Sequence, residues 1–169
     1  MNMSYAWCMP NHQTFKIKPV GEFIRKHLPD GLILDPFANR PSDFGAITND
    51  INPAADTDFH MDALSFLKMY DDNSIDGILF DPPYTPRQLK ECYDNIGQTL
   101  HDAKSSVWSN WRIEIARVLK PGGVCLSFGF NSVGIGKTRG FEKAHLLIVC
   151  HGGQHNDTMC LLETKLETH

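Results

Sequence analysis

The stretch at residues 75–84, Ile-Asp-Gly-Ile-Leu-Phe-Asp-Pro-Pro-Tyr, is a short apolar run that ends abruptly at an acid and two prolines. The run at 75–80 predicts a buried β-strand. Two consecutive prolines end the hydrogen-bond ladder and keep the backbone extended, so they fix the Asp81 carboxylate, the Pro82 carbonyl and the Tyr84 ring in one geometry. Two rigid acceptors beside an aromatic ring suit a flat heterocycle with an exocyclic amine. The alternative is a plain strand-ending turn, because Asp-Pro is a common turn dipeptide.

Apolar runs alternate with helix-like segments on both sides of this strand. This order predicts an α/β domain with a mainly parallel, doubly wound sheet and helices on both faces. Two final runs flank a polar, Gly-rich turn and predict a C-terminal hairpin that adds an antiparallel edge. The expected strands are 31–35, 46–50, a weaker 58–62, 75–80, 124–128, 144–150 and 159–166, and the expected helices are 21–28, 63–69 and 108–119.

Length and composition limit the class of protein. With 169 residues, 41% hydrophobic and 21% charged, the chain is long enough for one globular domain, and we expect a single domain over 1–169. No apolar run approaches a membrane span, and the start lacks the order of a secretion signal. Five scattered cysteines predict reduced thiols in a cytoplasm. A net charge of −4 argues against a strongly basic nucleic-acid coating protein but leaves room for a local basic surface.

Acids follow four successive predicted strands, namely Asp35, Asp50, Asp62 and Asp81. Any one of them alone is explained as a cap or turn residue. Because doubly wound sheets bind ligands at the carboxyl ends of their strands, the four together predict a binding site at that edge.

The chain resembles the amino-methyltransferases with an Asp-Pro-Pro-Tyr motif that methylate adenine N6 in DNA. Besides residues 81–84, the resemblance rests on 16–20, 35–38, 49–53, 62–67 and 120–123, in the usual order of that family between residue 14 and about residue 128. More narrowly, the segments 81–87, 136–141 and 150–157 are similar to small adenine methyltransferases carried by phages and prophages.

This resemblance implies a Rossmann-like class I methyltransferase fold, S-adenosylmethionine as cofactor, and double-stranded DNA with a flipped adenine as substrate. It also implies a bacterial or phage-infected host cell as location. The implied catalytic residues are Asp81, Pro82, Pro83 and Tyr84. The expected cofactor-binding residues are Phe15, Lys18, Asp35, Pro36, Phe37, Ala38, Asp50, Ile51, Asp62 and Ala63. The expected substrate-binding residues are Arg87, Lys137 and Arg139, in basic segments suited to neutralise phosphates.

The cofactor loop departs from the family pattern. Where the family continues with Gly-x-Gly after Asp-Pro-Phe-x, this chain has Asn39-Arg40-Pro41. Glycine lets a backbone approach a ligand closely, so we expect a looser cofactor site. The 15 residues from Asp35 to Asp50 also leave little room for a helix between those strands. Three alternatives stay open: a non-catalytic nucleic-acid- or protein-binding module, cytosine N4 methylation, and RNA as substrate. Without a recognition domain, we expect low sequence specificity, or specificity supplied by a homodimer.

Two weaker patterns have competing explanations. The segment Gly134-Ile-Gly136-Lys137-Thr138 resembles a phosphate-binding loop. That loop needs a glycine five positions before Gly136, and this chain has Asn131 there. Cys150, His151, His155 and Cys160 could form a zinc set, but their spacing matches no common finger and we expect no metal site.

Overall fold

The computed structural model describes residues 1–97 and 106–167, which form one seven-stranded sheet in the order β1-β6-β7-β5-β4-β2-β3. Strand β7 runs antiparallel to its neighbours β5 and β6, whereas the pairs β1–β6, β5–β4, β4–β2 and β2–β3 are parallel. The strands are β1 (Asn2–Trp7), β2 (Ile33–Asp35), β3 (Ile47–Thr48), β4 (Ile75–Phe80), β5 (Leu119–Gly129), β6 (Phe141–Cys150) and β7 (Thr158–Lys165).

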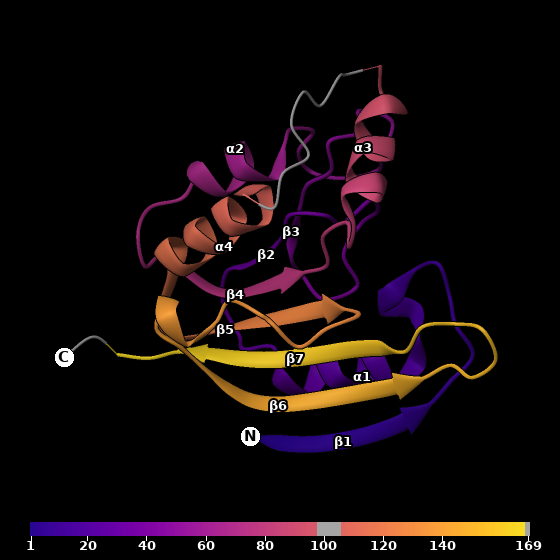
Figure 1. The fold of residues 1–169 in the computed structure, drawn as a ribbon. Coiled ribbons are helices and arrows are strands. Elements are labelled where there is room, and N and C mark those ends of the chain that lie inside the picture. The colour runs from indigo at the N-terminus through magenta and orange to yellow at the C-terminus, as the bar shows by residue number, and fades with distance from the viewer. Residues whose placement is uncertain (98–105, 168–169) are drawn as a thin grey trace.

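Helices cover both faces of the sheet (Figure 1). The α-helices are α1 (Lys18–His27), α2 (Ala63–Lys68), α3 (Pro86–Asp94) and α4 (Ser106–Val118), and short 3₁₀ turns lie at η1 (Thr14–Lys16) and η2 (Lys137–Arg139). Side chains alternate across each strand, so Leu79 packs in a core with α1, while Ile78 and Phe80 pack in a core with α2 and α4. The predicted three-layer α/β architecture is confirmed.

The capping residues explain where the helices on one side begin. The Asp62 carboxylate accepts hydrogen bonds from the backbone N–H groups of Leu64 and Ser65 at the start of α2. The Thr85 hydroxyl accepts one from Gln88 N at the start of α3, where Pro86 takes the first helical position.

The sheet differs from the expected one at two places. The weak strand expected at 58–62 is reduced to a single bridge between Asn49 and Phe59, because this short segment pairs only at its centre. The predicted hairpin exists as β6–β7, but it does not form the edge, since β1 pairs with β6 outside it. Outside the sheet, helix α3 at 86–94 was not among the expected helices.

No helix follows β2. The chain passes from β2 to β3 through an irregular loop at 36–46, as the short spacing predicted. Because β2, β3 and β4 are adjacent and parallel, their carboxyl ends meet at one edge of the sheet, with this loop beside them. Among the described residues, no helix is long and apolar enough to cross a membrane.

Candidate active site

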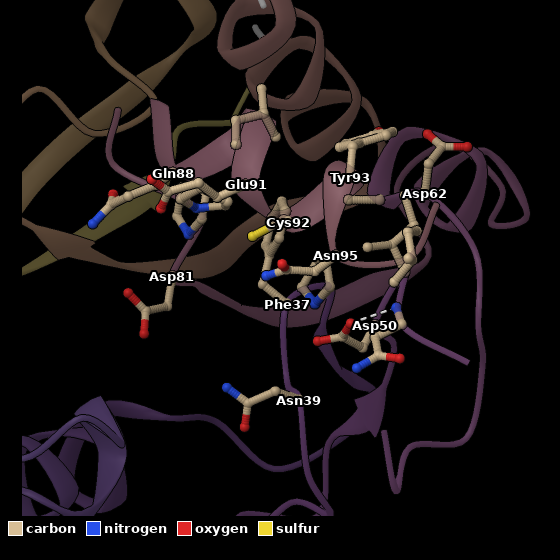
Figure 2. A pocket seen from close by; sticks show the side chains of 18 of the residues that line it. Phe37, Asn39, Asp50, Asp62, Asp81, Gln88, Glu91, Cys92, Tyr93 and Asn95 are labelled. Carbon is tan, nitrogen blue, oxygen red and sulfur yellow. Dashed lines mark hydrogen bonds between the residues drawn. The ribbon is translucent and has the colours of Figure 1, made fainter. Parts of the chain in front are cut away.

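A cavity of about 510 Å³ lies at the carboxyl ends of β2, β3 and β4, with α3 as its far wall. Figure 2 shows Asp81, Asn39 and Asp50 around one open space, with Cys92 of α3 across from Asn39. The cavity brings together most of the predicted catalytic and cofactor-binding residues: Pro36, Phe37, Asp50, Ile51, Asp62, Ala63, Asp81, Pro82, Pro83 and Tyr84.

A second, smaller cavity of about 90 Å³ adjoins the first. It contains three further predicted residues, Phe15, Asp35 and Ala38, and it shares Asp81 and Asn39 with the larger cavity. The predicted cofactor loop therefore borders both cavities.

The loop after β2 keeps a left-handed backbone without glycine. Asn39 stands at the first position where a glycine was expected from the sequence resemblance, and its φ is +49°. Asparagine tolerates this region better than other residues with a side chain, because its short amide can hydrogen-bond locally. The loop therefore has a residue in the left-handed region at this position although it has no glycine there.

Asn49 ties the ends of three segments together beneath the cavity. Its fully buried side chain donates to Pro36 O (3.2 Å) and Met61 O (2.9 Å), and accepts from Met61 N at 3.1 Å. Its backbone N–H donates to Asp35 O at 3.0 Å. These bonds fix the positions of the segments that carry the acids at 35, 50 and 62 relative to one another. Asn49 therefore has a structural role directly before Asp50 in the sequence.

The carboxylates at 50 and 62 already have local partners. Asp50 Oδ1 accepts from Asn52 N at 2.7 Å, and Asp62 Oδ1 caps α2. Both also line the large cavity. A carboxylate has acceptor capacity for further partners, so capping and ligand binding are compatible for both residues.

Asp35 and Asp81 end neighbouring strands and interact electrostatically. Burial and the nearby Asp81 carboxylate raise the pKa of Asp35 to about 8. Burial also raises the pKa of Asp81, but hydrogen bonds from Tyr84 and Thr14 favour its ionised form. Near neutral pH, this arrangement favours a proton on Asp35.

The loop after β4 is held at three points. Trp108 Nε1 donates to Pro83 O at 2.9 Å, and Tyr84 N donates to Gln88 Oε1 at 2.8 Å. The Tyr84 hydroxyl donates to Asp81 Oδ1. Among the described residues, no donor reaches Pro82 O. Asp81 and Pro82, at the start of this loop, both line the large cavity.

Four predicted residues lie outside both cavities. Lys18 is exposed on α1 opposite Glu22 at 4.0 Å, and Arg87 is exposed on α3, where it pairs with Glu91 at 2.8 Å. Lys137 is exposed on η2. Arg139 is half-buried and donates to Ile135 O and Ser109 Oγ, both at 3.1 Å.

One wall of the large cavity was not anticipated from the sequence. Helix α3 presents Leu89, Cys92 and Tyr93 to it, with the spacing of one helical face, and Ile96 lines it just beyond the helix. Thr85 followed by Pro86 is a helix-start signal that could have revealed this helix. Other lining residues that were not expected are Thr14, Asn39, Asn52, Gln88, Glu91, Asn95 and Trp111.

The two weaker sequence patterns have structural explanations. The backbone N–H groups of Ile135 and Gly136, in the loop that resembles a phosphate-binding loop, donate to the buried Glu163 carboxylate at 2.6 and 3.1 Å. Both ring nitrogens of His151 bind within the protein, to Cys8 O and Thr158 Oγ1. The described residues contain no group of three or more side chains placed to hold a metal.

Comparison with solved structures identifies the class of fold. No protein-family model and no curated protein sequence matches the chain. A solved S-adenosylmethionine-dependent methyltransferase from Methanosarcina mazei is similar over 86% of this chain and 98% of its own, with 14% identity and a TM-score of 0.55. The Escherichia coli protein yhhF, assigned as a methyltransferase, is similar over 89% and 85%, with 10% identity and a TM-score of 0.52. The chain therefore has the class I methyltransferase fold.

Proposed function

We propose that this protein transfers a methyl group from S-adenosylmethionine to the exocyclic N6 amine of adenine in DNA. One juxtaposition carries the proposal: the rigid acceptors at Asp81 and Pro82 border the same cavity as the acids at 50 and 62. A site for an amine and a site for a nucleoside-like cofactor are thereby adjacent.

The large cavity suits the cofactor. Its volume of about 510 Å³ falls in the range typical of small-molecule sites. Asp50 offers a carboxylate to ribose hydroxyls, and Asp62 offers one to an adenine amine. Phe37, Ile51 and Ala63 supply apolar contacts for a flat ring. When bound, S-adenosylmethionine would supply an electrophilic methyl group on a sulfonium.

The protein's own contribution is to orient the target amine. An exocyclic amine on an aromatic ring is a poor nucleophile, because its lone pair is delocalised into the ring. Hydrogen bonds from its two N–H groups to the Asp81 carboxylate and the Pro82 carbonyl would favour a more tetrahedral nitrogen, with its lone pair directed into the cavity. Position and electrostatics then provide most of the rate enhancement.

The Tyr84 ring supplies a stacking surface beside these acceptors. It packs against Gly129, where an added Cβ would lie 3.2 Å from the ring, and against the half-exposed Phe130 at 4.6 Å between centroids. A base inside a duplex exposes its amine to an enzyme only after leaving the stack. Stacking of the extruded base on an aromatic ring contributes roughly 1–3 kcal/mol per base in single-strand binders.

A pair of arginines beside the motif supports a nucleic-acid substrate. Arg139 donates to Ser109 Oγ, the neighbour of the Trp108 that binds Pro83. Arg112 lies close enough to Arg139 for the like charge, together with burial, to lower the Arg112 pKa. Neither arginine has a salt bridge to a described carboxylate, and the Nε atoms of both lack a hydrogen-bond partner there. The Glu163 carboxylate lies near Arg112 and partly offsets its charge, but it forms no salt bridge with either arginine. Two clustered guanidinium groups suit a phosphodiester.

The proposal is tested with purified protein, methyl-labelled S-adenosylmethionine and three separate substrates: duplex DNA, single-stranded DNA and RNA. We expect label in N6-methyladenine of DNA, and about 100-fold less with Asp81→Ala. Asp30→Ala, at an exposed position away from the site, is the matched control and should act like wild type.

Other outcomes would redirect or overturn the proposal. Label in N4-methylcytosine or in RNA would contradict the adenine or the DNA assignment. If no substrate is labelled although the protein binds S-adenosylmethionine, the proposed substrates are wrong. Failure to bind it at all would favour a non-catalytic binding module.

A further inference from the structure

Strand β1 exposes a stripe of large apolar side chains at alternate positions. Met3 is 53% exposed, Tyr5 67% and Trp7 67%, and Met1 and Met9 continue the alternation on either side. Scattered single apolar residues are normal on a surface, whereas a contiguous row marks an interaction site. We call these five side chains the β1 stripe.

The sheet topology explains why the β1 stripe is uncovered. Ala6 and Cys8 point to the opposite face and pack with the core around α1. On the stripe's own face, α2 and α4 pack over β4 and β5, and Figure 1 shows no helix over β1. On β6, the partner of Tyr5 is the half-buried Ile148, which extends the apolar row, whereas the partner of Met3, Leu146, is buried.

The stripe lies on a firmly attached strand. Residues 2–7 pair in register with β6, and Cys8 N donates to Cys150 O at 3.1 Å beyond the end of the strand. His151 Nδ1 binds Cys8 O at 2.7 Å. The exposed row therefore belongs to ordered sheet and not to a loose terminal segment.

No side chain of β1 carries a charge. Residues 1–15 contain no Lys, Arg, Asp or Glu. Edge strands of monomeric proteins are commonly protected by charged side chains, often lysine, and β1 has none. An uncharged apolar row gives no like-charge repulsion against an identical row, so it is complementary to itself.

We propose that the β1 stripe is the interface of a two-fold symmetric dimer, in which a second copy of this chain packs its own stripe face to face against it. A two-fold interface uses the same patch on both copies, as a self-complementary row allows. Tyr and Trp bury roughly 150–250 Å² each when the whole side chain is covered. Tyr5 and Trp7 are each 67% exposed in one copy, so a partner can cover about two thirds of that area, and the three methionines add to it. Doubled over two copies, the area approaches the roughly 1,200–2,000 Å² of specific interfaces. Methionines also adapt readily to an opposing surface.

The test is the mass of the full chain in solution, measured by sedimentation and light scattering from low to high micromolar concentration. We expect twice the 19.1 kDa of one chain for wild type. The double variant Tyr5→Lys, Trp7→Lys should be monomeric, with association weakened at least tenfold. Ile113→Lys, at a 51% exposed apolar position on α4, is the matched control and should remain dimeric.

Hydrogen exchange on the wild type keeps the inference testable if the double variant fails to fold. Amides of residues 2–9 and 146–149 should gain protection as the protein concentration rises. A wild type that is monomeric throughout the range, a folded double variant that still dimerises, or a dimer without added protection in these segments would each overturn the inference. None of these readouts depends on methyl transfer, so the interface and the proposed function can fail separately.

Discussion

The Tyr84 hydroxyl donates a hydrogen bond to Asp81 Oδ1, within the motif that also provides the proposed amine acceptors. Burial and the Asp81 carboxylate raise the pKa of Tyr84 well above its ordinary value, so the phenol keeps its proton and remains a donor. A substrate amine that binds Asp81 must share or displace this bond. The tyrosine thus favours the ionised carboxylate while the site is empty.

Tyr84→Phe should shift the pH dependence of methyl transfer and leave the stacking ring in place. Without the phenol, the pKa of Asp81 rises further, because a bond that favours its ionised form is lost. The acidic limb of the kcat/KM profile should therefore move to higher pH, while activity above that limb stays within a few-fold of wild type. A profile that coincides with wild type would show that the bond does not influence Asp81.

Asp35→Asn should remove a pH dependence of stability. The folded protein holds a proton on Asp35 up to about pH 8, whereas an unfolded chain releases it near pH 4, so stability falls as pH rises through that window. The loss amounts to as much as about 1.4 kcal/mol per pH unit. Denaturant unfolding from pH 5 to pH 8 should give a flatter curve for Asp35→Asn, which keeps an acceptor for Phe37 N. Parallel curves for the two proteins would contradict the raised pKa.

Substitutions at Asn39 should change the affinity for S-adenosylmethionine according to how well the new residue tolerates a positive φ. Asn39→Gly keeps the backbone at φ +49° without strain and should bind S-adenosylmethionine at least as tightly as wild type. Asn39→Val costs roughly 1–2 kcal/mol or more in this conformation, and affinity should fall about tenfold. Calorimetric titration of both variants measures the difference. Equal affinities would mean that the loop conformation does not control cofactor binding.

Arg112→Ala should weaken DNA binding without affecting the fold. Arg112 makes no hydrogen bond to another described residue, and its loss removes one phosphate contact, so the slope of log affinity against log salt should decrease by about one. Lys26→Ala, on α1 across the sheet, is the control and should leave the slope unchanged. If both variants behave alike, the arginine pair is not a phosphate site.

The strand β4 and the motif after it were predictable because the signal is local. The apolar run 75–80 matches β4 from end to end, and two prolines leave the chain few conformations beyond it. The acids at 35, 50, 62 and 81 could be assigned to one edge from topology alone. Their burial, and with it the raised pKa of Asp35, depends on packing between segments far apart in the chain.

Two elements escaped prediction for different physical reasons. Strand β1 pairs with residues some 140 positions away, and its apolar side faces outward, so its alternation gives no information about the core. Helix α3 has only Leu89 fully buried. Its role as a cavity wall arises from its position across the strand ends, and a helix-start signal alone does not specify that position.

The most direct test of the central claim is expression of wild type and Asp81→Ala in a host without adenine methylation, followed by mass spectrometry of nucleosides from its DNA and RNA. The account predicts N6-methyladenine in the DNA of cells with wild type and far less of it with Asp81→Ala at equal protein levels. N6-methyladenine at the same level with both proteins, or no methylated base with either, would contradict it.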